Sequence, residues 1–139
     1  MTTSFTTDRA LRFGDCDMSG TAYYPSYINL LNGVVEEYFT TIGFPWHKIM
    51  WEERWGTPTV HLTCDFSKPS FFGEVLTFGL IVRRVGRSSA TFDHEISCGG
   101  QLRWTGHHVI AASNIDDHTS VPWPEAVKGE LETWIVAKG

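Results

Sequence analysis

The chain has 139 residues, of which 42% are hydrophobic and 19% are charged, and these values are typical of a globular protein rather than a disordered one. This length suffices for one domain, which we expect to cover residues 1–139. The formal charge of −5 argues against nonspecific binding to nucleic acid, because that affinity depends on many lysine and arginine contacts to phosphate.

The first predicted element is a strand over about residues 4–13. A long helix follows over 24–42, where apolar residues recur at spacings of three and four along one face. Pro25 suits the first turn of this helix, and Gly43 is a typical stop signal. After the helix, 44–58 predicts an aromatic connection without periodic structure.

Apolar residues then alternate with polar ones, which predicts antiparallel strands over 59–66, 76–82, 90–98 and 101–114. Gly106 interrupts the alternation of the last strand and predicts a bulge there. A short amphipathic helix is expected over 124–135. The order predicts an α+β fold in which a five-stranded sheet covers one long helix. The open edges of such a sheet favour a dimer.

The cysteines of the chain favour a reducing compartment. There are three of them, Cys16, Cys64 and Cys98, with no CxxC pair. The first residues, MTTSFTTDRAL, lack the features of a signal peptide, and no run reaches the ~18 apolar residues that a membrane span needs. We therefore expect a cytoplasmic protein without a membrane segment.

Asp15 and Asp17 precede the long helix and have three competing interpretations. A calcium loop is disfavoured because Ser26 occupies the position that needs a bidentate glutamate. The two carboxylates can instead cap a turn or pair with Arg9 or Arg12. The third interpretation is a catalytic carboxylate that faces the start of a helix.

The catalytic interpretation depends on amides at the start of the helix. If the helix begins near Pro25, the N–H groups of Tyr24, Ser26 and Tyr27 lack intrahelical partners and can stabilise a developing oxyanion. Asp17 can then attack an activated carbonyl or take a proton from the attacking water. Residue types alone leave this interpretation and the capped turn both open.

The histidines and Cys16 offer weaker chemistry. His107 and His108 are adjacent, so on a strand they point to opposite faces and do not form a zinc site. His61 and His94 lie within strand patterns, where we expect hydrogen-bonded structural histidines. Cys16 lies between two aspartates, which oppose formation of a reactive thiolate.

The string RFGDCDMSGTAYYPSYINLL, residues 12–31, resembles the opening signature of hotdog-fold acyl-CoA thioesterases, most closely the 4-hydroxybenzoyl-CoA thioesterase family. GTPTV, DFSKPSFFGEVL and VGRSSATFDHEI follow in the order that this family shows, so the resemblance spans about residues 8–115. It implies a hotdog fold, a homodimer whose two sheets join, and active sites at the subunit interface. By analogy, two such dimers pair into a homotetramer.

The resemblance implies that Asp17 is the nucleophile or general base and that the amide of Tyr24 polarises the thioester carbonyl. Asp15 has a supporting role. The substrate-binding residues expected from this resemblance are Gly20, Asn32 and Thr63. At the position of Asn32 the family has a carboxylate that receives a ring hydroxyl, and an asparagine lacks that charge.

Coenzyme A carries phosphates, and the resemblance places its nucleotide end near the turn that contains Arg83, Arg84, Arg87 and Ser88. Lys68 and Arg103 are weaker candidates. No metal or cofactor is implied. The resulting expectation is hydrolysis of an aryl-CoA to the free acid and CoA. The alternatives are an acyl-CoA-binding protein without hydrolysis, a thioesterase for short-chain aliphatic acyl-CoA, and a hydratase on the same fold.

Overall fold

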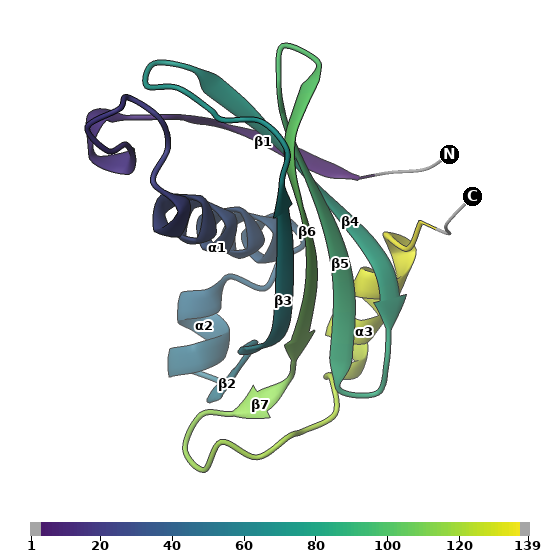
Figure 1. The fold of residues 1–139 in the computed structure, drawn as a ribbon. Coiled ribbons are helices and arrows are strands. Elements are labelled where there is room, and N and C mark those ends of the chain that lie inside the picture. Colours follow the sequence, from purple (N-terminus) through teal and green to yellow (C-terminus); the bar gives the residue numbers. More distant parts are fainter. Residues whose placement is uncertain (1–3, 137–139) are drawn as a thin grey trace.

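The computed structural model describes residues 4–136 and has the predicted order of strand, long helix, strands and short helix (Figure 1). The helical elements are the 3₁₀ turn Phe13–Asp15, α1 (Tyr24–Thr41), α2 (Trp46–Trp51) and α3 (Glu125–Thr133). The strands are β1 (Phe5–Ala10), β2 (Trp55–Gly56), β3 (Thr59–Phe66), β4 (Val75–Val85), β5 (Ser89–Cys98), β6 (Gln101–Ala111) and β7 (Ser113–Asn114).

Five strands form one antiparallel sheet in the order β1-β4-β5-β6-β3. The sheet curves around α1, which lies across one of its faces, and α3 lies beside the far part of β4 (Figure 1). The expected α+β architecture, with a long helix, a five-stranded antiparallel sheet and a short C-terminal helix, is therefore confirmed.

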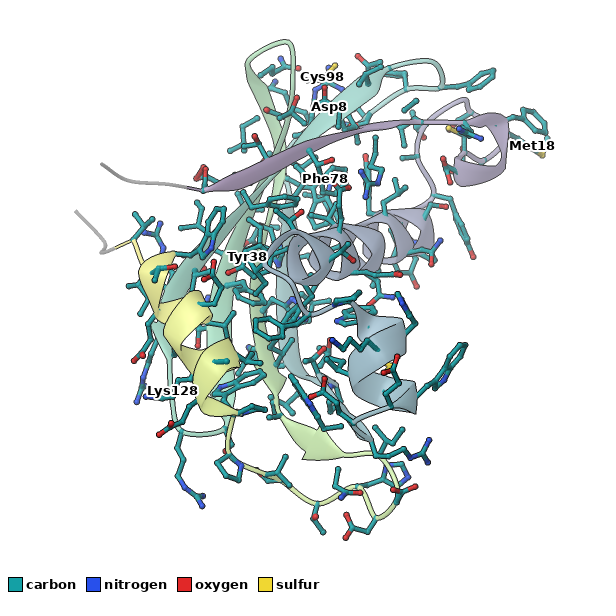
Figure 2. All side chains as sticks on the ribbon, turned by 180° about the vertical axis from the view of Figure 1, so that it is seen from behind. Asp8, Met18, Tyr38, Phe78, Cys98 and Lys128 are labelled. Atoms are coloured by element: carbon teal, nitrogen blue, oxygen red, sulfur yellow. The ribbon has the colours of Figure 1, made fainter. Side chains whose placement is uncertain are left out.

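α1 buries the apolar face that its sequence pattern predicts. Pro25 lies in its first turn, and the chain leaves the helix through Gly43, whose φ of +98° suits glycine. Tyr38 of α1 and Phe78 of β4 lie in the interior between helix and sheet (Figure 2). The side chains that α1 buries are Tyr27, Leu31, Val34, Val35, Tyr38 and Phe39. Full burial of such a side chain contributes roughly 1.5 to 3 kcal/mol.

The two faces of the sheet differ in polarity. Alternate residues of β4, β5 and β6 are buried beneath α1, including Phe92, Ile96 and Trp104. The other face carries polar side chains such as Asp93 and His107. This alternation is what a sheet with one covered face requires.

Residues 44–58 are more structured than the sequence predicts. They contain α2 and β2, and β2 pairs with β7, the two-residue strand that follows β6. The strand expected over 101–114 is divided into two: β6 ends at Ala111, and β7 begins at Ser113. Periodicity did not reveal α2 or β2 because both are short.

The last long strand is bulged, as predicted, but not at Gly106. The register between β5 and β6 shifts between Ile96 and Ser97, whose partners are Trp104 and Leu102. Gly106 lies in regular register opposite both Cys64 and His94. A Cβ at this position would lie 3.6 Å from the Cβ of His94, so any larger side chain would press on the buried imidazole. Gly106 therefore leaves room for the side chain of His94 and does not interrupt the strand.

The edge strand β3 is exposed over much of its length, and Val60 and Phe66 keep 61% and 50% of their surface in solvent. An exposed edge with apolar side chains is available to pair with another strand. Among the helices within residues 4–136, none is long and apolar enough to cross a membrane.

Candidate active site

Asp17 lies at the base of a tight turn before α1. Its carbonyl accepts from the amide of Gly20 (3.0 Å), and its own amide donates to the carbonyl of Thr21 (3.0 Å). Gly20 has a φ of +81°, a conformation that glycine adopts without strain. An antiparallel bridge between Cys16 and Ala22 closes the hairpin. The local sequence therefore fixes the backbone of Asp17.

The carboxylate of Asp17 is ionised and exposed. Oδ1 accepts hydrogen bonds from the hydroxyl and from the amide of Ser19, the latter at 2.9 Å. These bonds lower the pKa of Asp17 below its ordinary value, the hydroxyl being the larger cause. Asp17 borders a cavity of about 600 Å³ whose other lining residues are largely apolar: Phe13, Cys16, Met18, Gly20 and Phe72. An exposed anion beside an apolar cavity is suited to act on a bound acyl group.

Asp15 stabilises the same turn through hydrogen bonds and is not assigned a catalytic role. Its Oδ2 accepts from the amide of Arg12 (2.9 Å), and its carbonyl accepts from the amide of Tyr23 (2.9 Å). Burial, together with Asp15 and Asp17, raises the pKa of the Cys16 thiol. Cys16 is therefore unsuited to act as a thiolate nucleophile.

A second loop holds the Asp17 turn in place. Ala22 donates to the carbonyl of Ser70 (2.8 Å), and Phe72 donates to the carbonyl of Gly20 (2.9 Å). Thr21 forms a bridge with Phe71. The Asp17 turn is thus fixed to the segment that leads into β4.

Glu74 and the buried Arg103 brace that second loop. Arg103 donates from Nη1 to Oε1 of Glu74 (2.7 Å) and from Nη2 to Oε2 (2.9 Å), and it also donates to the carbonyl of Pro69 (3.0 Å). Glu74 Oε1 also accepts from the amide of Phe71 (2.7 Å). These bonds, those from Arg103 first, lower the pKa of Glu74 to about 2. Arg103 is therefore part of a structural ion pair.

The start of α1 differs in detail from the expectation. Ser26 donates to the carbonyl of Tyr23 (2.8 Å), so the expectation that its amide is unpaired is wrong. Tyr24 is the first residue of α1, so no helical carbonyl precedes it that could accept a hydrogen bond from its amide. Its exposed side chain lines a separate cavity of about 360 Å³ with Tyr27 and Phe66. Within the described part of one chain, Asp17 and Tyr24 do not line the same cavity.

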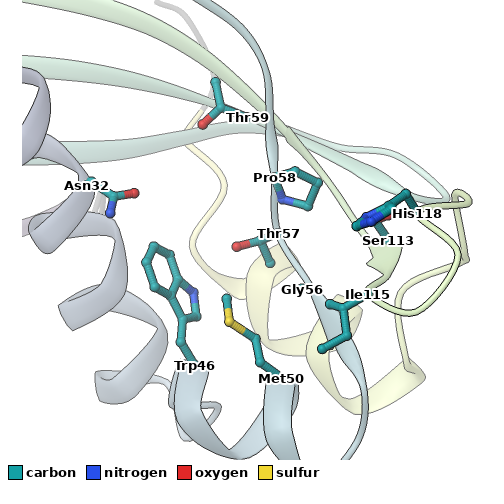
Figure 3. Close-up of a pocket in the computed structure, with 10 residues that line it drawn as sticks. All are labelled: Asn32, Trp46, Met50, Gly56, Thr57, Pro58, Thr59, Ser113, Ile115 and His118. Carbon is teal, nitrogen blue, oxygen red and sulfur yellow. The ribbon is translucent and has the colours of Figure 1, made fainter.

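Asn32 lines a third cavity, of about 310 Å³, between α1, α2 and the start of β3 (Figure 3). Asn32 and Thr59 point into this space from different elements. Trp46 Nε1 and Thr57 Oγ1 belong to lining residues and are buried without a hydrogen-bond partner among residues 4–136. We name this space the Asn32 cavity; its other lining residues are Met50, Gly56, Pro58, Ser113, Ile115 and His118.

Thr63 does not lie in the Asn32 cavity. It lines a cavity of about 300 Å³ on the opposite face of the sheet, with Asp93 and His107. The register between β3 and β6 shifts between Thr59 and His61, and such an irregularity reverses the side of the sheet to which preceding residues point. Thr59 consequently lies on the side of α1, whereas Thr63 lies opposite His107.

The histidines confirm one expectation and add one unforeseen contact. His107 and His108 point to opposite faces, as predicted, since His107 is exposed and His108 is buried. His94 is buried, and its Nε2 lies 3.2 Å from Nδ1 of His108. His108 Nε2 lies 2.8 Å from Oγ1 of Thr59. Sequence reasoning missed Thr59 as a cavity residue, although it lies in the GTPTV motif.

The proposed phosphate ligands lie at and before the β4–β5 turn. Arg83 is held on the sheet, where its Nε donates to Asp93 Oδ2 (2.8 Å) and its Nη1 donates to the carbonyl of Val136 (3.1 Å). Arg84 and Arg87 are exposed, and Ser88 Oγ accepts from the hydroxyl of Ser120 (3.2 Å). Of the three arginines, Arg84 and Arg87 are thus the more accessible to an anion.

The Asp17 turn and the β4–β5 turn lie at opposite ends of the sheet (Figure 1). The Asp17 turn contacts the loop just before β4, and Arg84 and Arg87 lie at the far end of that strand. A strand of this length spans about 35 Å. Among the described residues, no group of three or more His, Cys, Asp or Glu side chains is arranged to hold a metal ion.

The sequence matches the model of the thioesterase-like superfamily over residues 11–131. It is 26% identical to a 1,4-dihydroxy-2-naphthoyl-CoA hydrolase of Nostoc punctiforme over 96% of this chain and 84% of that protein. It is 30% identical to a 4-hydroxybenzoyl-CoA thioesterase of Pseudomonas sp. strain CBS-3 over 70% of each chain.

A solved structure of a 4-hydroxybenzoyl-CoA thioesterase, an aspartate-to-asparagine mutant in complex with 4-hydroxybenzoyl-CoA, superposes with a TM-score of 0.83. The two chains are 26% identical, and the match covers 92% of this chain and 97% of the other. The sheet wrapped around α1 is therefore the hotdog fold, and these matches are consistent with a thioester hydrolase.

Proposed function

Because the chain belongs to the thioesterase-like superfamily, we propose that it hydrolyses an aryl-CoA thioester to the free acid and CoA, with Asp17 as nucleophile or general base. The observation that carries the proposal is the ionised, exposed carboxylate of Asp17, fixed in a turn that leads directly into α1 and borders an apolar cavity. An acyl group can rest on the apolar surface while the carboxylate acts on its carbonyl.

Two routes use these groups. In the first, Asp17 attacks the thioester carbonyl, the C–S bond breaks, CoA leaves as a thiolate that is then protonated, and water hydrolyses the resulting anhydride. In the second, Asp17 takes a proton from water as the water attacks, and the tetrahedral intermediate then expels CoA. In both routes the amide of Tyr24 and the dipole of α1 stabilise the negative charge on the carbonyl oxygen.

We further propose that a homodimer forms the complete site. Pairing β3 with β3 of a second copy about a two-fold axis runs the two strands antiparallel. The end of one chain that holds Asp17 and Tyr24 then lies beside the partner's opposite end, which holds the Asn32 cavity and the β4–β5 turn. This arrangement unites groups that lie at opposite ends of a single chain. Association of such dimers into a tetramer is our proposal by analogy.

The dimer would bring the β4–β5 turn near the thioester, where CoA needs cations for its phosphates. Arg84 and Arg87 are exposed there and suit phosphate through their planar fork of donors. Arg83 is the weaker candidate because Asp93 already binds its guanidinium. We place the protein in the cytoplasm, where the free thiols of its three cysteines would stay reduced.

The relatives favour an aromatic acyl group. One relative is named for a 4-hydroxybenzoyl thioester and another for a dihydroxynaphthoyl thioester, and both acyl groups are flat and carry ring hydroxyls. The Asn32 cavity, bordered by Trp46 and Met50, offers an apolar wall for a flat ring. We propose Asn32 as an uncharged hydrogen-bond partner for a ring oxygen. We propose Gly20, which lines the cavity beside Asp17, as a contact of the acyl group.

Thiol release from a panel of CoA esters tests the proposal. The purified protein is given 4-hydroxybenzoyl-CoA, 1,4-dihydroxy-2-naphthoyl-CoA, benzoyl-CoA and butyryl-CoA with a thiol reagent, and kcat/KM is compared. We expect the two hydroxyaryl esters to be the best substrates. Preference for butyryl-CoA would contradict the aryl assignment. Tight binding of aryl-CoA without thiol release would instead identify an acyl-CoA-binding protein.

A further inference from the structure

A chain of polar contacts runs from the core of the protein into the Asn32 cavity. His94 is 1% exposed, and its Nε2 lies 3.2 Å from Nδ1 of the buried His108. His108 Nε2 lies 2.8 Å from Oγ1 of Thr59, which lines the cavity. The proposed mechanism does not use either imidazole, so the contacts have a different role.

Both imidazoles are neutral at physiological pH. Burial, together with the neighbouring imidazole of His108, lowers the pKa of His94 to about 3. Burial and the charge of His107 lower the pKa of His108 to about 4. Each ring therefore carries a single N–H, and the position of that proton determines the direction of every hydrogen bond in the chain.

The hydrogen bonds can run from His94 toward Thr59 or from Thr59 toward His94. The unpaired nitrogen of His94 decides between these two directions. Among the described residues, His94 Nδ1 is buried and has no hydrogen-bond partner. If the proton were on Nδ1, a buried N–H donor would remain unsatisfied, which is rare in folded proteins. With the proton on Nε2, His94 donates to Nδ1 of His108. The proton of His108 must then lie on Nε2, which is also the intrinsically preferred tautomer of neutral histidine.

This direction fixes the role of Thr59. His108 Nε2–H donates to Oγ1 of Thr59, so the hydroxyl proton of Thr59 is directed to another acceptor. The Thr59 hydroxyl and the Asn32 amide point into the same space from β3 and α1 (Figure 3). No Lys, Arg, Asp or Glu is among the residues that line this cavity. The cavity thus presents a fixed donor and an uncharged amide to whatever enters.

We infer that the buried His94–His108 pair orients Thr59 as a hydrogen-bond donor, so that the Asn32 cavity selects acyl groups whose ring carries an oxygen at the end remote from the thioester. A ring hydroxyl can accept from Thr59 and donate to the side-chain carbonyl of Asn32, whereas an unsubstituted ring leaves both polar groups unpaired. This inference rests on the proposed function for its substrate. It assigns His108 and His94 as positioning residues and Thr59 as a specificity residue.

The first test reads the tautomers directly and needs no substrate. Long-range ¹H–¹⁵N correlation spectra of the full chain at pH 7 report which nitrogen of each histidine is protonated. His94→Phe and His108→Gln variants assign the two spin systems. We expect both rings to be neutral with the proton on Nε2. Protonation on Nδ1 in either ring would overturn the inference, because Thr59 would then donate back into the core.

The second test compares two substrates that differ only in the ring oxygen. Thr59→Val should lower the ratio of kcat/KM for 4-hydroxybenzoyl-CoA to kcat/KM for benzoyl-CoA about tenfold, whereas Thr59→Ser should retain this ratio. His108→Gln keeps an N–H near Thr59 and should retain more of the preference than His108→Phe. An equal loss on both substrates would contradict a specificity role and indicate a structural one.

The two tests separate this inference from the proposed function. If the wild-type protein hydrolyses no acyl-CoA, the proposed function fails. The inference is then decided by the tautomers, together with the binding of 4-hydroxybenzoate and benzoate to wild type and Thr59→Val. Equal binding of both acids by the wild-type protein would also overturn it.

Discussion

Glu74→Gln is expected to destabilise the protein because it breaks the ion pair that braces the Asp17 turn. Glu74 accepts two hydrogen bonds from Arg103 and one from the amide of Phe71, and Arg103 is 7% exposed. A glutamine keeps one acceptor but turns an NH₂ group toward the guanidinium. Because hydrogen bonds to charged groups contribute about 1.5 to 3 kcal/mol, we expect the free energy of unfolding to fall by about 2 to 3 kcal/mol at pH 7.

The loss should depend on pH in a defined direction. The folded protein holds the pKa of Glu74 at about 2, below its ordinary value of 4.5, so the carboxylate contributes stability that is fully present above about pH 4.5. That contribution is lost as the pH falls from 4.5 toward 2. The difference between wild type and Glu74→Gln should therefore be largest at neutral pH and shrink near pH 3.

Urea unfolding followed by circular dichroism at pH 7 and pH 3 measures this difference, at one protein concentration for all variants. Glu132→Gln is the matched control, because Glu132 forms an exposed ion pair with Lys128 on α3 and its loss should change stability by less than about 0.5 kcal/mol. A Glu74→Gln protein as stable as wild type at pH 7, or one whose deficit does not change with pH, would refute the reasoning.

Three further predictions concern the site. Ser19→Ala removes the larger cause of the lowered Asp17 pKa, so the acidic limb of the pH profile of kcat/KM should move to higher pH; an unmoved limb would contradict the role of this hydrogen bond. Replacing Arg84 and Arg87 together by alanine should raise KM for an acyl-CoA roughly fivefold but leave KM for the corresponding N-acetylcysteamine thioester, which lacks the nucleotide, unchanged. Val60→Asp places a charge on the exposed β3 edge and should shift sedimentation toward the monomer, whereas a stable dimer would argue against pairing through β3.

Local patterns sufficed for α1 and the main strands. The recurrence of apolar residues from Tyr24 to Ile42 and the stop at Gly43 identify α1, because helix periodicity and glycine at a positive φ are local properties. The alternation in β4 and β5 identified strands for the same reason. α2 and β2 escaped detection because a six-residue helix and a two-residue strand show less than two periods of any pattern.

The candidate site was only partly predictable because several of its contacts are non-local. The resemblance pointed to Asp17, but the brace between Glu74 and Arg103 joins residues distant in sequence. The register shift in β3 turns Thr59 toward the Asn32 cavity, whereas Thr63 lies beyond the shift and faces the other side of the sheet. A single-residue irregularity of this kind leaves no periodic signal in the sequence. In the sequence Arg83 resembles a phosphate ligand. In the structure the pairing of β4 with β5 places Asp93 beside Arg83, and Asp93 binds its guanidinium.

The central claim is that the carboxylate of Asp17 acts on the thioester, and the paired variants Asp17→Asn and Asp15→Asn test it most directly. Both variants remove one negative charge from the same turn. Among residues 4–136, however, the Asp15 carboxylate accepts a hydrogen bond only from the backbone amide of Arg12. With folding and dimerisation verified, kcat for 4-hydroxybenzoyl-CoA should fall about 10² to 10⁴-fold in Asp17→Asn and remain near the wild-type value in Asp15→Asn. Turnover by Asp17→Asn at the wild-type rate would contradict the account.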